Sequence, residues 1–526
     1  MNVRPKAINA GRKPAVRLWP FAAALLTLAV LGTLGFDWYS GKLGIIGPHF
    51  EVVQTAAGKI IKVPPGGNVQ AAIARAEGGD IVELQAGATY FGEIKLPKKA
   101  LTDFITIQTS AIPELPADKR IGPEHAPLLA KIVTRDASPA LSAANGAHHF
   151  RFVGIEFAPA SNAYVYNLVV FGNGETAANL PHDLEIDRCY LHTYKSAIAR
   201  RGIALNSAST TIKNSYFEGF AFNSEETQGI AGWTGTRNVR IINNYIEAGA
   251  ENVLFGGADP DSADLIPTDI EVRGNHLNKS TDWIKKATCK TLFQLKNAKR
   301  VQFVGNLLTN NWEGSAIRLT VRNQENHAAY STIEDILIKD NMIDKSADGF
   351  NILGKDDTYP SQTLKRLTIV NNLFLGIAHG GNFDGAGYFV QIADGEDIVI
   401  ANNTVFNSGN ITSLYGTLPR GFVFRDNIVG HGNYGVHGPI DMRSEAAKAM
   451  FNNNVIMNLN RVPSDDYAFP PGNSIVGDVK DVGFQDPAAK NFTLSANSRF
   501  RGKSTQRSDI GADLKGSSFS ALLSKQ

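Results

Sequence analysis

The sequence has little cysteine, few charged residues and no excess of either charge sign. Its 526 residues include only two cysteines, Cys189 and Cys289, too few for a disulfide framework or a multi-cysteine metal site. The 52 basic and 50 acidic residues nearly cancel, so the chain lacks the basic excess of a nucleic-acid-binding protein. Charged residues make up 19% of the chain and hydrophobic residues 43%, which excludes an intrinsically disordered protein. What is abundant is glycine, with 50 residues, beside many asparagines.

An uncharged apolar run near the amino terminus, residues 18–36, follows a basic segment, residues 1–17. Its 19 residues are close to the number that a membrane-spanning helix needs, and the basic flank predicts a cytoplasmic amino terminus. Bulky residues follow the run, which favours a membrane anchor over a cleaved secretory signal or a buried core helix. The rest of the chain is then extracytoplasmic, in the periplasm or at the cell surface, or secreted if the segment is cleaved.

A short pattern recurs through most of the chain and places an asparagine in one column of eight copies. The column residues, 24 to 35 positions apart, are Asn244, Asn275, Asn306, Asn341, Asn372, Asn403, Asn427 and Asn454. Degenerate earlier copies place Ile155, Cys189 and Ser215 there. Large apolar residues stand three positions before and two positions after each asparagine, and the alternation predicts a short strand on each side.

The residue before each column asparagine is always glycine, asparagine or aspartate. These types adopt left-handed backbone conformations at low cost, which predicts a sharp bend in every copy. Two strands around a bend, with a third apolar stretch between copies, predict one turn of a right-handed parallel β-helix, an all-β solenoid. The asparagine amides are expected to hydrogen-bond along the stack. The cysteines lie about three turns, roughly 14 Å, apart, so both are expected to be free thiols.

The predicted solenoid covers residues 61–515, between a linker at 37–60 and a tail at 516–526. Asn68 to Ala76 is expected to form a capping helix with Asn68 as its N-cap, followed by a first strand within residues 79–90. The proline-rich segment 111–130 is interpreted as an extended surface excursion. Residues 486–494 and 508–512 are interpreted as the closing segment.

These features resemble a known group of proteins. The helix followed by Gly79–Leu84 and Gly87–Tyr90, the asparagine column and the Asp509–Ala512 ending are similar to bacterial pectate-lyase-like right-handed β-helix proteins, the pectin lyase-like superfamily. The resemblance covers about residues 60–515. It implies the fold, whereas the members of this superfamily include polysaccharide lyases, glycoside hydrolases, epimerases and non-catalytic surface proteins.

Each turn has a further strand before the two described, and its outward residues form a polar row. The residues taken to point inward are Ile203, Ile230, Val253, Phe293, Ile317, Ile352 and Val390. The outward row is then Asn252, Gln294, Arg318, Asn351 and Gln391. The resemblance implies that an extended sugar chain binds along this strand, between loops at 256–268, 279–290 and 321–331. The predicted substrate-binding residues are Arg201, Asn252, Gln294, Asn351 and Gln391.

The favoured chemistry is β-elimination from an acidic, uronate-containing polysaccharide. In this reaction an arginine or lysine takes the proton next to a carboxylate, whose charge is neutralised by a cation, often calcium. Arg318 is the outward residue best suited to this role, with Lys296 about one turn away. The predicted calcium ligands are Asp259, Asp261 and Asp264. The protein is expected to be a monomer.

Two alternative functions stay open. A glycoside hydrolase would need paired carboxylates, for which Asp356, Asp357 and Asp384 are candidates, but the side chains of adjacent residues diverge in an extended chain. A non-catalytic cell-envelope protein would use the same polar row for binding, or would serve as a rigid rod.

Aromatic residues and histidines give weaker signals. Three tryptophans are expected either to stack on sugar rings or to fill the interior: Trp233, Trp283 and Trp312. Three histidines without metal-ligand spacing are interpreted as surface or turn residues: His148, His149 and His276.

Overall fold

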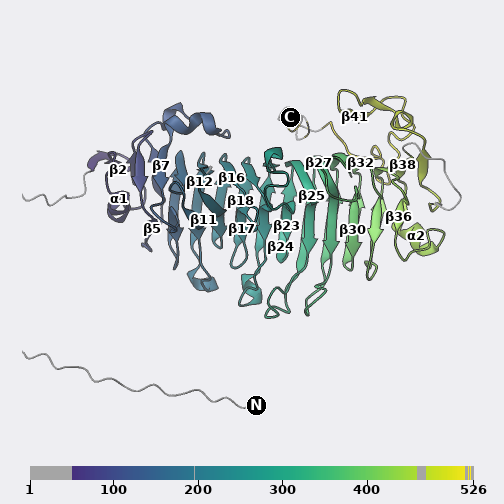
Figure 1. The fold of residues 1–526 in the computed structure, drawn as a ribbon, viewed down its shortest axis with the longest axis horizontal. Coiled ribbons are helices and arrows are strands. Elements are labelled where there is room, and N and C mark those ends of the chain that lie inside the picture. Colours follow the sequence, from purple (N-terminus) through teal and green to yellow (C-terminus); the bar gives the residue numbers. More distant parts are fainter. Residues whose placement is uncertain are drawn as a thin grey trace, which may run out of the picture. The chain divides into compact units, whose positions relative to one another are not determined.

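Each turn of the chain adds one strand to each of three parallel ladders, so the chain winds into a β-helix (Figure 1). The one exception to parallel pairing within the described ladders is the first strand, Glu51–Thr55, which pairs antiparallel with Gly58–Val63. We call these ladders 1, 2 and 3 in the order in which the chain visits them within a turn. The structure is a computed structural model, and it describes residues 50–194, 196–378, 380–458 and 469–515, together with 519 and 522. The residues from Pro48 onward form one compact unit.

The three ladders differ in how regular their strands are. Ladder 2 comprises β1 (Glu51–Thr55), β2 (Gly58–Val63), β3 (Ile81–Leu84), β6 (Ile105–Thr109), β9 (His148–Val153), β12 (His182–Asp187), β15 (Ala208–Lys213), β18 (Arg237–Ile242), β21 (Thr268–Arg273), β24 (Ala298–Val304), β26 (Ile333–Lys339), β28 (Lys365–Val370), β31 (Glu396–Ala401), β34 (Val423–Arg425) and β37 (Phe451–Asn452). Ladder 3 comprises β4 (Thr89–Phe91), β7 (Ala130–Val133), β10 (Ile155–Ala158), β13 (Tyr190–His192), β16 (Tyr216–Phe220), β19 (Tyr245–Ala248), β22 (His276–Asn278), β29 (Leu373–Ile377), β32 (Thr404–Asn407), β35 (Ile428–Gly430), β38 (Val455–Met457) and β39 (Ser474–Val476). Ladder 1 comprises β5 (Ile94–Leu96), β8 (Leu141–Ala143), β11 (Tyr164–Phe171), β14 (Ile198–Leu205), β17 (Gln228–Gly232), β20 (Glu251–Phe255), β23 (Thr291–Leu295), β30 (Val390–Ala393), β33 (Thr412–Leu414) and β36 (Val436–His437). The long strands β25 (Leu307–Thr320) and β27 (Met342–Leu353) pass through the corner and belong to ladders 3 and 1 together.

The predicted asparagine column lies at the corner between ladders 2 and 3, and its side chains bond from turn to turn. The Asn341 Oδ1 accepts hydrogen bonds from the backbone N–H of Asn306 at 2.9 Å and from its amide at 3.0 Å. The Asn341 amide donates in turn to the carbonyl of Phe303 at 2.9 Å and to Asn372 at 2.9 Å. The column is buried and continues to Asn473, which accepts from the backbone N–H of Asn454 at 3.0 Å.

The predicted bend before each column residue is also confirmed. The preceding residue has a left-handed backbone in every copy, from Asn243 at φ 54° to Asn453 at φ 54°. The degenerate copies keep the geometry, because Ser215 Oγ accepts from the backbone N–H of Cys189 at 3.0 Å. Both cysteines are buried and free, as predicted, and burial raises the pKa of the Cys189 thiol to about 12.

Replacing Asn341 with alanine is expected to lower the free energy of unfolding by roughly 2–4 kcal/mol, because the buried N–H of Asn306 and the carbonyl of Phe303 lose their partner. Urea unfolding followed by circular dichroism measures this. Asn179→Ala is the control, since that side chain is exposed and bonds only Thr176, at 3.5 Å. Equal unfolding midpoints for the two variants would contradict a stabilising role for the column.

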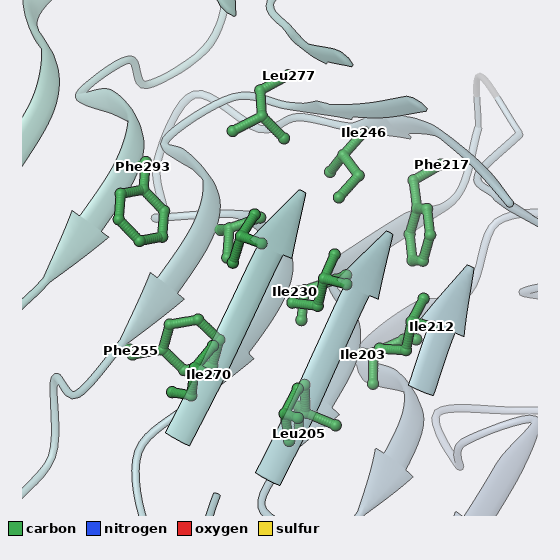
Figure 2. Close-up of a cluster of buried hydrophobic side chains, with 14 of the residues drawn as sticks. Ile203, Leu205, Ile212, Phe217, Ile230, Ile246, Phe255, Ile270, Leu277 and Phe293 are labelled. Atoms are coloured by element: carbon green, nitrogen blue, oxygen red, sulfur yellow. The ribbon is translucent and has the colours of Figure 1, made fainter. Parts of the chain in front are cut away.

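The core fills the space between the three ladders with apolar side chains. Figure 2 shows Ile203, Ile230 and Phe293 from ladder 1 facing residues of the other two ladders. Each of these three side chains is fully buried. Because successive turns repeat this arrangement, each turn buries its own apolar side chains against its neighbours, as in other solenoids.

The ends of the solenoid are covered largely as predicted. Helix α1 (Val69–Arg75) has Asn68 as its N-cap, whose side chain accepts from the N–H of Ala71 at 2.9 Å. Strands begin earlier than expected, since β1 and the first half of β2 fall within the segment 37–60 taken as a linker. At the other end β40 (Phe484–Asp486) and β41 (Asn491–Leu494) form a hairpin, and the N–H of Gly511 returns to the carbonyl of Asp426 at 2.9 Å.

Helices are short throughout the part of the chain that the structure describes. Besides α1 they are α2 (Glu445–Met450) and the 3₁₀ turns η1 (Ile112–Glu114), η2 (Pro123–Leu128), η3 (Ala177–Asn179), η4 (Ala263–Leu265), η5 (Thr281–Trp283) and η7 (Val479–Val482). Among these described residues no helix is long and apolar enough to span a bilayer. The predicted anchor at 18–36 lies outside the described residues and stays a prediction.

Candidate functional site

Four residues of the predicted polar row lie in register on the outer face of ladder 1. Gln294 pairs with Arg318, Arg318 with Asn351, and Asn351 with Gln391. They alternate with buried residues that point into the core. In that inward row the residue beside Ile317 is Phe350, where the sequence predicted Ile352. The row therefore aligns three amides and a guanidinium on successive turns, and the Asn351 amide donates a hydrogen bond to Gln391 at 2.9 Å.

Asn252 does not belong to this row, contrary to the sequence prediction. The register places Leu254 beside Gln294, and Asn252 is completely buried. Its amide donates to the carbonyls of Ile246 and Asn278, both at 2.7 Å. Asn252 follows the corner between β19 and β20, where the regular alternation of the strand is interrupted, so its amide satisfies backbone groups and does not face solvent.

A cavity of about 330 Å³ lies beside the row on ladder 1. It contains three residues that the sequence singled out, Arg201, Lys296 and Trp233. The remaining lining residues are Tyr166, Arg200, Glu226, Gln228, Ala231, Leu254, Gly256, Gly257 and Ala258. Thus residues from five successive turns, up to 130 positions apart in sequence, line one cavity.

Glycine makes room for this cavity between Trp233 and Lys296. Strand pairing aligns Gly232, Phe255 and Leu295, so the next position of each turn is Trp233, Gly256 and Lys296. Gly256 has φ 90°, and a Cβ there would stand 2.6 Å from the backbone N of Asn297. A larger residue would therefore be strained and would also crowd the floor of the cleft.

Cations and aromatic rings form one wall of the cavity. The Arg201 guanidinium lies 5.1 Å from the ring centre of Trp233 and 5.1 Å from that of Tyr166, while Arg200 lies 4.8 Å from Tyr166. Burial and the neighbouring charge of Arg200 lower the pKa of Arg201, but a guanidinium still keeps its proton. This wall offers a poorly hydrated positive charge between flat rings, which suits a sugar carboxylate.

Lys296 lines the same cavity, and no ion pair to its ammonium is found among the described residues. Burial lowers the pKa of Lys296 below the ordinary lysine value, although the nearby acids Glu251 and Glu226 oppose the shift. Among the described residues those two acids contact Lys290, not Lys296. An unpaired, partly desolvated lysine with a lowered pKa can accept a proton more readily than a surface lysine.

The two acids have different protonation behaviour. Burial raises the pKa of Glu251, which is completely buried and accepts a hydrogen bond from the Gln228 amide at 2.8 Å. Burial would also raise the pKa of Glu226, but contact with the Lys290 ammonium lowers it on balance. Glu226 is therefore held ionised by Lys290, and Glu251 lies behind the cavity as a weaker acid.

Buried polar atoms that lack a hydrogen-bond partner gather along this face. Within the described chain ten side chains have such an atom, and six of them are on strands β14 to β25 of ladder 1. They are Arg201, Gln228, Glu251, Asn252, Gln294 and Arg318. Native proteins leave few buried polar groups unsatisfied, so this concentration marks the face as one suited to polar ligands.

Arg318, the sequence's first choice of base, does not line the cavity. It lies one turn further along the polar row, beside Gln294, and a Cβ built on Gly314 would approach its Nη2 to 3.1 Å. The sequence pattern favoured Arg318 over Lys296 because Arg318 was expected to point outward, but it gave no information on which loops enclose each side chain.

The predicted calcium ligands are not brought together. Both carboxylate oxygens of Asp259 accept backbone N–H groups, from Gln324 at 2.6 Å and from Glu325 at 2.8 Å. Asp264 accepts from the Ser262 hydroxyl at 2.5 Å. These acids and Asp261 do not form a group of potential ligand atoms within 4.8 Å of one another in the described chain. Asp259 instead fastens the loop after β20 to the loop after β25.

Two of the three carboxylates considered for a hydrolase, Asp356 and Asp357, also have structural partners. Asp356 accepts from the backbone N–H of Asn323 at 2.7 Å, and Arg322 binds both Asp356 and Asp357. The two roles expected for the tryptophans, filling the interior or facing a ligand, are divided between different residues. Trp312 is buried, whereas Trp233 lines the cavity.

Comparison with known proteins was informative only for the structure, since neither a protein-family model nor a curated protein sequence matches the chain. A PL6-family alginate lyase, AlyGC, matches with a TM-score of 0.53 at 14% identity, over 88% of this chain and 58% of that one. The chain has the pectin lyase-like right-handed β-helix fold. It spans little more than half the length of the AlyGC structure.

Two further solved structures match less well. A mannuronic acid-specific family 6 lyase from human gut microbiota has a TM-score of 0.42 at 14% identity, covering 79% of this chain and 90% of that one. The catalytic unit of a GH87 α-1,3-glucanase from Streptomyces thermodiastaticus strain HF3-3 has a TM-score of 0.47 at 12% identity, covering 81% and 70%.

Proposed function

We propose that this β-helix protein is a polysaccharide lyase that cleaves an acidic, uronate-containing chain bound along ladder 1. The observation that carries the proposal is the position of Lys296, a lysine with a lowered pKa and no ion pair among the described residues, in a cavity that Arg201 also lines. A base and a fixed positive charge in one cavity are the two groups that proton abstraction beside a carboxylate needs. The similar fold of an alginate lyase agrees with this proposal.

The reaction would proceed by β-elimination. Neutral Lys296 Nζ takes the proton from the carbon next to the sugar carboxylate, and Arg201 stabilises the negative charge that develops on the carboxylate oxygens. The electron pair forms a carbon–carbon double bond as the glycosidic C–O bond at the neighbouring carbon breaks. The leaving oxygen takes a proton from water, and the lysine returns its proton to solvent. The products are a shortened chain and an unsaturated uronate.

The remaining residues of the face would bind sugar on either side of the cleavage point. Arg318, Asn351 and Gln391 extend the polar row away from the cavity, at the turn-to-turn spacing of about 4.8 Å. A sugar unit is comparable in length to this spacing, so an extended chain of several units would contact several turns. Arg200 and Arg201 would supply the positive charge that the sequence analysis assigned to calcium.

The assay for this function measures the ultraviolet absorbance of the unsaturated product. The purified full chain is incubated with polymannuronate, polyguluronate and polygalacturonate, with and without calcium, and with a neutral α-1,3-glucan as control. We expect absorbance to rise with at least one uronate polymer and not with the glucan. New reducing ends without absorbance would indicate hydrolysis, and binding without either product would indicate the non-catalytic alternative; both results would refute the lyase.

A further inference from the structure

A cluster of three histidines lies on ladder 2, apart from the residues of the proposed lyase site. His148 is the first residue of β9 and His182 the first residue of β12. The two strands pair in parallel with these histidines directly beside each other. Their rings stack with centres 4.6 Å apart and planes inclined by 4°. The sequence separation of 34 residues is one turn of the solenoid, which is why short-range ligand spacing did not reveal the pair.

His149 is turned toward this pair by an unusual backbone. Its φ is 59°, in the left-handed region that a histidine seldom adopts, so the strand does not carry its side chain to the opposite face. Its Nδ1 lies 2.7 Å from the Nδ1 of His148, and its ring stands edge-on to that of His182, with centres 6.3 Å apart. One ring nitrogen from each histidine lies within 4.8 Å of the other two.

Asp183 completes the arrangement. Its Oδ2 lies 2.6 Å from the Nδ1 of His182, and it too has a left-handed backbone, with φ 50°. A carboxylate that accepts a hydrogen bond from one ring nitrogen fixes the orientation of the ring and leaves the other nitrogen with its lone pair, as around metal-bound histidines. The side chains of His182 and Asp183 are 40% and 38% exposed, so an ion in solution can reach them.

We propose that His148, His149 and His182 bind one divalent transition-metal ion, such as Zn²⁺, with Asp183 orienting His182. Three imidazoles favour zinc, cobalt, nickel or copper, whereas calcium and magnesium prefer oxygen ligands. Zinc requires nitrogen atoms about 2.0–2.1 Å from the ion, and small rotations of the three rings would bring them to that distance. The ion would join two successive turns and stabilise the amino-terminal part of the solenoid.

The test uses the purified full chain without a polyhistidine tag, treated with a chelator and then dialysed. Calorimetric titration with ZnCl₂ is expected to show saturable binding of one ion per chain and a rise in the melting temperature. CoCl₂ is expected to give the visible absorption of cobalt bound by histidine, and excess CaCl₂ is not expected to displace either metal.

Two variants preserve the left-handed backbone, because asparagine tolerates it. Asp183→Asn removes the group that orients a ligand and is expected to weaken zinc affinity by about 10- to 100-fold. His149→Asn removes a ligand itself and is expected to weaken zinc affinity more than that. His437→Asn, at an exposed histidine of β36, is the control and should bind zinc normally. Melting curves without metal establish that each variant is folded.

Failure to bind zinc in a one-to-one ratio, or equal binding by the His149→Asn and His437→Asn proteins, would overturn the proposal. Binding at other surface groups would persist in His149→Asn and would therefore count against the site. The titration does not depend on lyase activity, so the two proposals stand or fall separately.

Discussion

Lys296→Met is expected to lower the rate of unsaturated-uronate formation by about 100- to 10,000-fold, the usual contribution of a general base. Methionine keeps the length and apolar contacts of the stem but cannot take a proton. The lysine lines the cavity beside Gly257, where a Cβ would stand 3.8 Å from its Nζ, so the cleft keeps its shape when only the amine is removed. Initial rates at saturating polymer measure the effect, and binding of the polymer should change far less than kcat.

The matched control is Lys365→Met on ladder 2, where the lysine forms an ion pair with Glu334 at 3.0 Å outside the cavity. This variant should retain full activity. If Lys296→Met also kept full activity, another residue would be the base. Loss of activity in Arg318→Met would then point to Arg318, the base first expected from the sequence.

The pH profile tests the same role of Lys296. A lysine acts as a base only when neutral, so the rate should rise with pH through the pKa of Lys296. Because burial lowers that pKa, activity should appear at a lower pH than an ordinary lysine, with its pKa of about 10.4, would allow. Lys296→Arg should be inactive across this range, since a guanidinium stays protonated. A rate that does not vary with pH would contradict the assignment.

Lys279→Met is expected to lower the free energy of unfolding by roughly 3–5 kcal/mol, as is typical when one partner of a buried charged interaction is removed. Lys279 is completely buried at the end of β22. Its ammonium donates to the carbonyls of Ala248 at 3.2 Å and Ala250 at 3.1 Å, and also to that of Gly249. Methionine fills the space but leaves these three carbonyls at the corner before β20 without a donor.

Urea unfolding followed by circular dichroism measures this loss of stability. Lys286→Met changes an exposed lysine of the following loop and is expected to shift the free energy of unfolding by less than about 0.5 kcal/mol. A Lys279→Met protein as stable as the control would mean that water satisfies the carbonyls. The corner leads directly into Glu251 and the proposed active site, so lower activity should accompany any loss of stability.

Much of the fold was predictable because its information is local and repeated. The asparagine column needs only one asparagine and one residue tolerant of a left-handed backbone per turn, and eight copies reveal the period. The ninth member, Asn473, escaped notice because the apolar flank three positions before it is missing: Pro470 stands there. Four residues of the polar row were found for the same reason, since strand alternation is a local property.

The errors occurred where alternation stops. Asn252 was expected to face solvent, but it follows a corner and turns its amide toward two carbonyls. Asp259 looked like a metal ligand, yet it binds backbone N–H groups of a loop some 65 residues away. Lys279 gave no signal, because a lysine in a loop is ordinarily solvated.

The sequence by itself determined the solenoid, its period, the bend in each turn and the free state of both cysteines, because these features depend on contacts that every turn repeats. Only the tertiary structure decided which charged groups meet. Lys296 and Arg201 share a cavity, Arg318 lies outside it, and His182 joins His148 and His149. A side chain's pKa and partners depend on the loops that enclose it and on the residues of neighbouring turns. Those contacts are made once in the chain, so no repeat in the sequence announces them.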